Sequence, residues 1–139
     1  MLELVDRFRP RTERALVERV VAATLAFAAR PEWEVSLLLT DDAEIAQLHE
    51  EFLGDPTPTD VMSFEMDGGA EVVVSVETAR RTACANGTTI RAEVALYIVH
   101  GLLHTLGYDD KQTSQRRRMR AAERAVLQQL RLEVRDVDA

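Results

Sequence analysis

The stretch VALYIVHGLLHTLGYDD, from Val94 to Asp110, combines an almost unbroken apolar run with two histidines, a glycine and two aspartates. Apolar side chains at nearly every position of its first part predict a helix that is buried on all sides. His100 and His104 are four residues apart, so on a helix both imidazoles project from the same face, one turn apart. The pattern therefore predicts a central helix that carries two adjacent imidazoles.

Two imidazoles that point into one small volume are typical ligands of zinc and related metals. Gly107 predicts the end of the helix, and a chain that turns there can bring a third ligand back toward the histidines. We predict Asp110 as this ligand, with its neighbour Asp109 as the alternative. Three protein ligands leave a fourth position for water, as in catalytic zinc sites. The prediction is a catalytic metal site on the central helix, held by His100, His104 and Asp110.

The flanking sequence alternates between strand-like and helical patterns. Strands are expected at about residues 2–6, 33–40, 60–66 and 70–76, the last two joined by the hairpin signal DGG. Helices are expected at about residues 10–29, 41–54, 77–85, 91–106 and 113–132. This order predicts one α+β domain over residues 1–139, a small mixed sheet of about four strands covered by about five helices.

The composition is ordinary for a globular protein, with 46% apolar and 29% charged residues. The single cysteine, Cys84, cannot form an internal disulfide, no signal-peptide pattern opens the chain, and no apolar run is long enough to span a bilayer. We therefore expect a cytoplasmic protein with no membrane partner. The net charge of −7 argues against a surface that binds nucleic acid as a whole. Arginine clusters at residues 7–14 and 115–120 are candidate basic patches, or simply solvated helix faces.

The spacing of the histidines, the glycine and Asp110 admits two classes of enzyme. In the metzincin proteases a glutamate, the general base, follows the first histidine. Gly101 stands at that position here, so the chain lacks the proton acceptor of a protease. A peptidase is therefore disfavoured.

The same stretch resembles the signature of the YbeY family, H-G-x-L-H-L-x-G-Y-D-H. This chain reads H-G-L-L-H-T-L-G-Y-D-D from His100 to Asp110. A second family block, P-T-D-V-L-S-F, is similar to PTDVMSF from Pro58 to Phe64. Together with the hairpin and helices between the blocks, and with Met119, Glu123 and Leu127 after them, the resemblance covers about the last two-thirds of the chain.

The resemblance implies a metal-dependent endoribonuclease that cuts single-stranded RNA, processes the 3′ end of 16S ribosomal RNA and takes part in ribosome quality control. It implies one Zn²⁺ per chain, or another divalent transition metal, and RNA and the small ribosomal subunit or its proteins as partners. A metal-bound water would attack the phosphodiester, with support from Asp109, Arg80 and Arg81. The second block would bind substrate, or hold its own loop through turn hydrogen bonds, with Thr59, Asp60 and Ser63.

Three positions differ from the family pattern. Asp110 stands where the signature has its third histidine, and Leu53 stands where the family commonly has an arginine before the second block. Glu71 stands where the family has an aspartate, at the start of the strand after the hairpin turn. A carboxylate ligand makes the metal a weaker Lewis acid and favours harder cations. Leu53 and the acidic net charge favour an alternative function, a ribosome-associated assembly factor that keeps the fold and the metal but has little hydrolytic activity.

Overall fold

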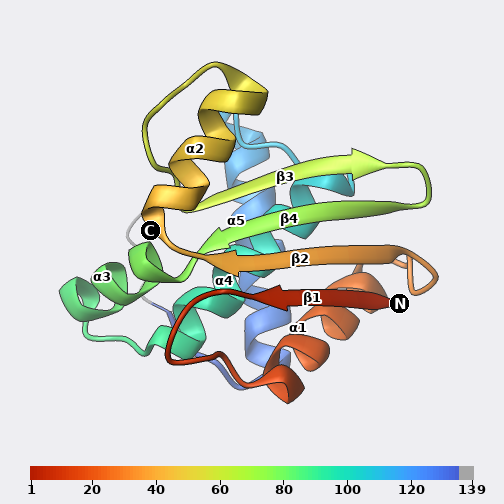
Figure 1. Ribbon diagram of the computed structural model, residues 1–139. Coiled ribbons are helices and arrows are strands. Elements are labelled where there is room, and N and C mark those ends of the chain that lie inside the picture. Colours follow the sequence, from red (N-terminus) through yellow and green to blue (C-terminus); the bar gives the residue numbers. More distant parts are fainter. Residues whose placement is uncertain (135–139) are drawn as a thin grey trace.

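In the computed structural model, which describes residues 1–134, four strands form one mixed sheet (Figure 1). The strands are β1 (Leu2–Asp6), β2 (Glu34–Thr40), β3 (Val61–Met66) and β4 (Gly69–Ser75). Their spatial order is β1-β2-β4-β3, with β1, β2 and β4 parallel and β3 antiparallel at one edge. β3 and β4 form the predicted hairpin, and the expectation of a small mixed sheet is confirmed.

Five helices are present within residues 1–134: α1 (Arg14–Phe27), α2 (Asp42–Leu53), α3 (Val76–Asn86), α4 (Ile90–Thr105) and α5 (Thr113–Gln129). Each lies close to a range that the sequence predicts, which confirms the α+β class. The largest difference is at α1, because residues 10–13 belong to the loop after β1 rather than to the helix. Asp6 holds that loop by accepting hydrogen bonds from the N–H groups of Phe8 and Thr12. The predicted domain range also includes residues 135–139, which lie outside the described residues.

α4 is the central helix of the fold. It packs on β3 and β4 and also contacts α1, α3 and α5. Figure 1 shows α1, α4 and α5 behind the sheet, whereas α2 lies across one end of the front. Val94, Ile98, Leu102 and Leu103 of α4 are each at most 1% exposed. The helix is therefore buried along most of its length, as the sequence predicts, whereas Ile90 and Arg91 in its first turn and His104 in its last turn reach the surface.

Gly101 allows α4 to approach the sheet closely. A Cβ atom at this position would lie 2.9 Å from Cγ1 of Val72 and 3.1 Å from Cγ2 of Val61. Side-chain atoms do not pack at such distances without displacing a neighbour. The glycine that distinguishes this chain from the proteases therefore has a packing role in the contact between α4 and the sheet.

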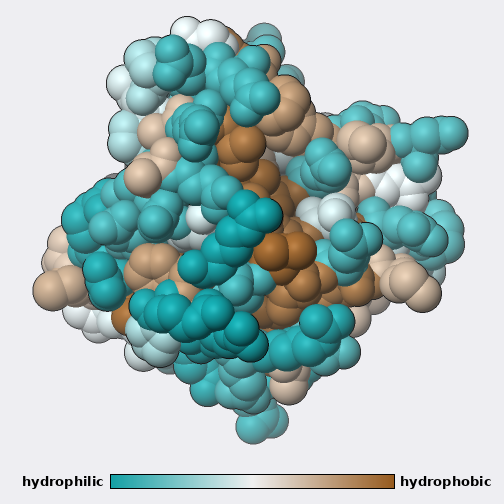
Figure 2. All heavy atoms as spheres, in the orientation of Figure 1, coloured by the Kyte–Doolittle hydropathy of each residue, from teal (hydrophilic) through white to brown (hydrophobic). Residues whose placement is uncertain are grey.

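The opposite face of the sheet is only partly covered. Figure 2 shows an apolar band that crosses this face. A groove of about 430 Å³ lies there, lined mainly by apolar side chains of the strands and α2, among them Leu38, Leu48, Phe52, Met62, Phe64 and Val73. None of the histidines in the described part of the chain lines this groove. Within residues 1–134, no helix is both long and apolar enough to cross a membrane.

Candidate metal centre

α4 ends in a turn that reverses the chain. Gly107 has a φ of +103°, a conformation that glycine adopts far more readily than other residues. The N–H of Tyr108 donates to the carbonyl of Leu103 at 3.0 Å, and the N–H of Gly107 donates to the carbonyl of His104 at 3.4 Å. This pair of bonds is the Schellman pattern of helix ends. It directs the following residues back toward the helix and brings the two aspartates beside the histidines.

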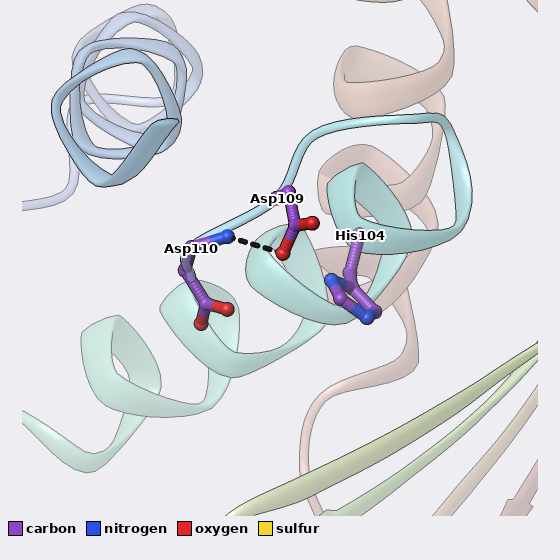
Figure 3. A group of neighbouring side chains, drawn as sticks. All are labelled: His104, Asp109 and Asp110. Atoms are coloured by element: carbon purple, nitrogen blue, oxygen red, sulfur yellow. Dashed lines mark hydrogen bonds between the residues drawn. The ribbon is translucent and has the colours of Figure 1, made fainter. Parts of the chain in front are cut away.

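Three side chains form a compact group at this turn: His104, Asp109 and Asp110 (Figure 3). One ligand atom of each lies within 4.8 Å of those of the other two. The N–H of Asp110 donates to Oδ1 of Asp109 at 2.7 Å, which fixes the turn between the two carboxylates. Imidazole nitrogen and carboxylate oxygen are ligands that zinc and other divalent transition metals accept. The donor set therefore fits a metal ion.

His100 lies one turn earlier on α4 and approaches the same group. Its Nε2 is 3.7 Å from Oδ2 of Asp110, which is longer than a hydrogen bond. Its Nδ1 hydrogen-bonds to Oε2 of Glu123 at 2.6 Å. In a neutral imidazole whose Nδ1–H donates to a carboxylate, Nε2 carries the lone pair that can bind a metal. His100 therefore presents Nε2 on the side where Asp110 lies.

Glu123, on α5, is a buried acid with two partners. Its side chain is 3% exposed, and its second oxygen, Oε1, accepts a hydrogen bond from Arg120 at 3.4 Å. The hydrogen bond with Glu123 raises the pKa of His100, burial opposes this shift, and the negative charges of Glu123, Asp110 and Asp60 reinforce it. If this imidazole binds a metal, as predicted, a proton competes for it, and we expect metal binding to weaken as the pH falls.

Known sequences resemble this chain over most of its length. A family model described as endoribonuclease YbeY matches residues 6–131. The endoribonuclease YbeY of Heliobacterium modesticaldum is 36% identical over 132 residues, covering 81% of this chain and 80% of its own length. That of Desulfitobacterium hafniense is 34% identical and covers 88% of this chain and 91% of its own length. The chain belongs to the YbeY family.

The fold also has a counterpart among solved structures. The solution structure of a Thermotoga maritima protein superposes with a TM-score of 0.67, over 94% of this chain and 92% of the other. The two sequences are 21% identical, so this likeness concerns the fold alone. The resemblance that the two sequence blocks indicate is thus confirmed by the family match, and the α+β fold agrees with a solved structure.

Both candidate aspartates lie at the turn that carries the YbeY signature. Asp109 belongs to the group around His104 and accepts the N–H of Asp110. Asp110 belongs to the same group and also lies 3.7 Å from His100. Asp110 is thus near both histidines, which supports its choice as the third ligand. The choice stays a prediction, because the two carboxylates share one small volume.

A cleft of about 500 Å³ opens beside this turn. Its lining includes His100, Asp110 and Asp60, the last from the loop before β3. Of the residues predicted to bind substrate, Asp60 lines the cleft, whereas Thr59 and Ser63 are not among its lining residues in the described chain. The hydroxyl of Thr59 donates to Oδ1 of Asp60 at 3.4 Å, a contact between neighbouring side chains of the loop.

The arginines predicted to support catalysis lie elsewhere. The guanidinium of Arg80 lies 5.4 Å from the centre of the Phe8 ring, and Arg81 pairs with Asp42 at 2.6 Å. Neither arginine is among the lining residues of the cleft in the described chain. The positions of Arg80 and Arg81 therefore do not support a catalytic role for either residue. Leu53, where the resemblance implies an arginine, is 60% exposed at the end of α2.

The sequence patterns do not identify Glu123 as the partner of the first histidine, 23 residues away. A signal was present, because Glu123 lies four residues after Met119 and four before Leu127, on the buried face of α5. An acid in such a place needs a partner. Arg120 and Arg124 also line the cleft. Of these two, only Arg120 falls in the arginine cluster that the sequence singles out.

Proposed function

We propose that this protein is a metal-dependent endoribonuclease that cuts single-stranded RNA in the maturation of ribosomal RNA. The observation that carries the proposal is the group of His104, Asp109 and Asp110, next to His100 and beside a cleft, in a chain of the YbeY family. The relatives that the chain matches carry the name endoribonuclease YbeY. Ligands for a divalent cation beside an open cleft suit a hydrolase that acts on phosphodiesters.

The residues that would hold the metal are His100, His104 and Asp110, with Asp109 as the alternative carboxylate. One Zn²⁺ per chain satisfies this donor set, and the carboxylates also suit harder divalent transition metals. When bound, the ion supplies Lewis acidity toward a phosphodiester and lowers the pKa of water.

The chain's own residues hold these groups in place. Glu123 fixes the imidazole of His100 so that Nε2 faces Asp110, and Asp109 fixes the backbone of Asp110. Arg120 and Arg124 add positive charge to the lining of the cleft, where guanidinium groups offset the negative charge of a phosphodiester. We assign no side chain as the general base.

The location, the specific RNA substrate and the partners in this proposal rest on membership of the YbeY family alone. We propose that residues 1–139 form one metallohydrolase domain that acts in the cytoplasm. Its substrate would be the 3′ end of 16S ribosomal RNA, and its role would extend to ribosome quality control. Its partners would be this RNA and the small ribosomal subunit or its proteins.

A second candidate function is ribosome assembly with little hydrolysis. The observation that favours it is Leu53, an exposed apolar side chain where the family commonly has an arginine. The net charge of −7 points in the same direction, because an acidic surface weakens the general attraction of RNA.

Metal content and RNA cleavage, measured on the same preparations, test the proposal. The variants are His104→Ala and Asp110→Ala, with Asp67→Ala as control, an exposed aspartate in the turn between β3 and β4. We expect about one equivalent of metal and chelator-sensitive cleavage of single-stranded RNA in the wild type and in Asp67→Ala. Both should be lost in the two site variants.

Other outcomes separate the alternatives. Metal without cleavage, together with co-sedimentation of the protein with small ribosomal subunits, would favour the assembly factor. Loss of metal in His104→Ala but not in Asp110→Ala would assign the third ligand to Asp109. Absence of metal from every preparation would contradict the metal site.

A further inference from the structure

α5 concentrates positive charge in a chain that is acidic as a whole. The net charge is −7, yet the helix carries Arg116, Arg117, Arg118, Arg120 and Arg124. Its one acidic residue is Glu123, which is buried and binds the first histidine of the metal centre. The outer surface of α5 is therefore basic, although the surface of the whole chain is not.

Four of these arginines gather around one hollow. Arg116, Arg117, Arg120 and Arg124, with Thr113, line a shallow pocket of about 490 Å³. The first and last are eight residues apart, so the row extends about 12 Å along the helix. We call these four residues the arginine stripe. The fifth arginine, Arg118, instead lies over the ring of Tyr108, with its guanidinium carbon 4.8 Å from the ring centre.

The arginine stripe is continuous with the cleft of the metal centre. Arg120 and Arg124 line both the shallow pocket and the cleft that contains His100 and Asp110. We call residues 107–110, which follow α4 and carry the two aspartates, the metal turn. Arg116 reaches this turn directly, because its guanidinium donates to the carbonyl oxygens of Asp110 at 3.4 Å and of the next residue, Lys111, at 3.3 Å. A chain of phosphates that follows the stripe therefore reaches both the cleft and the metal turn.

The cleft of the metal centre also has acidic residues in its lining. Asp60, Glu93, Asp110 and Glu123 contribute to its lining. Carboxylates repel phosphate oxygens, so among the charged residues of this lining only the arginines attract a nucleic acid. Aromatic residues make up 5% of the chain, which leaves little surface on which bases stack. Contacts to the backbone must then supply most of the affinity.

We propose that the arginine stripe binds the phosphate backbone of single-stranded RNA and leads the strand into the cleft beside the metal turn. This inference rests on the proposed function, since it assigns a binding surface to the same site. Planar guanidinium groups bind phosphate oxygens in pairs, and four of them along one helix match an extended strand. A duplex is recognised through wide contacts across its grooves, which one short row on a single helix does not provide.

Binding of a non-cleavable strand tests the stripe separately from catalysis. The probe is a fluorescein-labelled 2′-O-methyl RNA of about 12 nucleotides, followed by anisotropy at several salt concentrations. The main variant is Arg117→Glu, because Arg117 is exposed and no interaction of its side chain is found within residues 1–134. The matched control is Arg30→Glu, an exposed arginine at the turn between α1 and β2.

We expect Arg117→Glu to weaken binding of the probe by about threefold or more and to reduce the salt dependence by about 0.7 in the slope of log K against log salt. A second variant, Arg117→Ala with Arg124→Ala, should reduce the slope by about twice that amount. Arg30→Glu should change neither quantity by a comparable amount. Duplex RNA of the same length should bind more weakly than the single strand.

Equal affinities and equal salt slopes for Arg117→Glu and Arg30→Glu would overturn the proposal. So would equal binding of duplex and single strand, or no binding by the wild type. Cleavage of unmodified RNA by the metal-loaded wild type is measured in parallel. Binding that depends on Arg117, without any cleavage, would support the stripe and contradict the proposed enzyme. Cleavage and binding that are both the same in Arg117→Glu as in the wild type would contradict the stripe but not the enzyme.

Discussion

Glu123 places a carboxylate where α5 would otherwise present an apolar side chain to the core. Its two oxygens bind Nδ1 of His100 at 2.6 Å and Nη1 of Arg120 at 3.4 Å, and its side chain is 3% exposed. A buried acid with partners on both oxygens fixes the tautomer and the direction of the imidazole that it binds. In the proposed metal centre Glu123 is therefore a positioning residue that acts through His100, rather than a ligand.

Replacement of Glu123 by glutamine removes the negative charge but keeps the shape of the side chain, so the variant tests the effect of the charge. Glu123→Gln keeps an acceptor oxygen for His100, but we expect metal affinity to fall about 10- to 100-fold, because the uncharged partner makes the imidazole a weaker ligand. A competition titration against a fluorescent chelator measures this constant. Glu18→Gln, on the exposed face of α1, is the control. Equal affinity in both variants would mean that Glu123 serves the fold alone.

Gly101 has a different kind of constraint, set by space rather than charge. A Cβ atom there would lie 2.9 Å from Val72, so Gly101→Ala must push α4 away from the sheet. Overpacking of this kind outweighs the better helix propensity of alanine, and we expect the free energy of unfolding to fall by about 1 kcal/mol or more. Urea unfolding measures it. A gain in stability, which an unobstructed helix position would show, contradicts the close contact.

At the scale of elements, Asp42 joins the first turns of α2 and α3. Its Oδ1 accepts hydrogen bonds from the hydroxyls of Ser75 and Thr78, both at 2.6 Å, and its Oδ2 pairs with Arg81 at 2.6 Å. Burial alone would raise the pKa of Asp42, but these contacts more than offset it and hold the pKa below the ordinary value of 3.8. The ionised carboxylate therefore stabilises the junction of the two helices.

The sign of this shift predicts how stability depends on pH. Because the pKa of Asp42 is lower in the folded chain, its contribution is present above the ordinary value and is lost as the pH falls through the folded value. We expect Asp42→Asn to be less stable than the wild type by about 1 kcal/mol at neutral pH, a figure reduced for solvent screening. Urea unfolding at neutral pH and near pH 3 measures the difference. A difference that grows on acidification would contradict the assignment.

Most elements follow from local patterns. Local signals predict three elements within about one residue: the strand at residues 2–6, α2 and α4. Alternating polarity marks the strand, Asp41 is the N-cap of α2, and a glycine follows each of the two helices. The start of α1 is predicted too early, since Thr12 bonds to Asp6 instead of entering the helix. That bond joins residues six apart and leaves no mark in the helical periodicity.

At the scale of the whole molecule, the sequence cannot supply contacts between distant segments. The order β1-β2-β4-β3 is one example, because strand patterns do not state which strands pair. Asp60 of the cleft and Glu123 behind His100 are others, since both reach the metal centre only through the packing of β3 and α5 around α4. The metal turn itself is predictable, because His104, Gly107 and the two aspartates lie within one short stretch.

The two faces of the sheet divide the molecule into regions of different chemistry. The covered face carries α4 with His100 and His104 and the charged cleft, whereas the other face carries an apolar groove (Figure 2). The candidate metal ligands at the end of the central helix couple the chemistry of the site to the packing of the whole domain. Binding of an ion at this turn must therefore stabilise the folded state, which binds it, over the unfolded chain.

This coupling predicts that metal raises the stability of the whole domain. At a free concentration of zinc about 100 times the dissociation constant, we expect a gain of about 2.7 kcal/mol in the free energy of unfolding, because only the folded chain holds His100, His104 and Asp110 together. Thermal unfolding with and without zinc measures it as a rise of several degrees in Tm, which a chelator reverses. His104→Ala should lose most of the gain, and Asp67→Ala should keep it. A gain of equal size in His104→Ala would mean that zinc binds elsewhere on the chain, and the metal turn would lose its part in the proposed function.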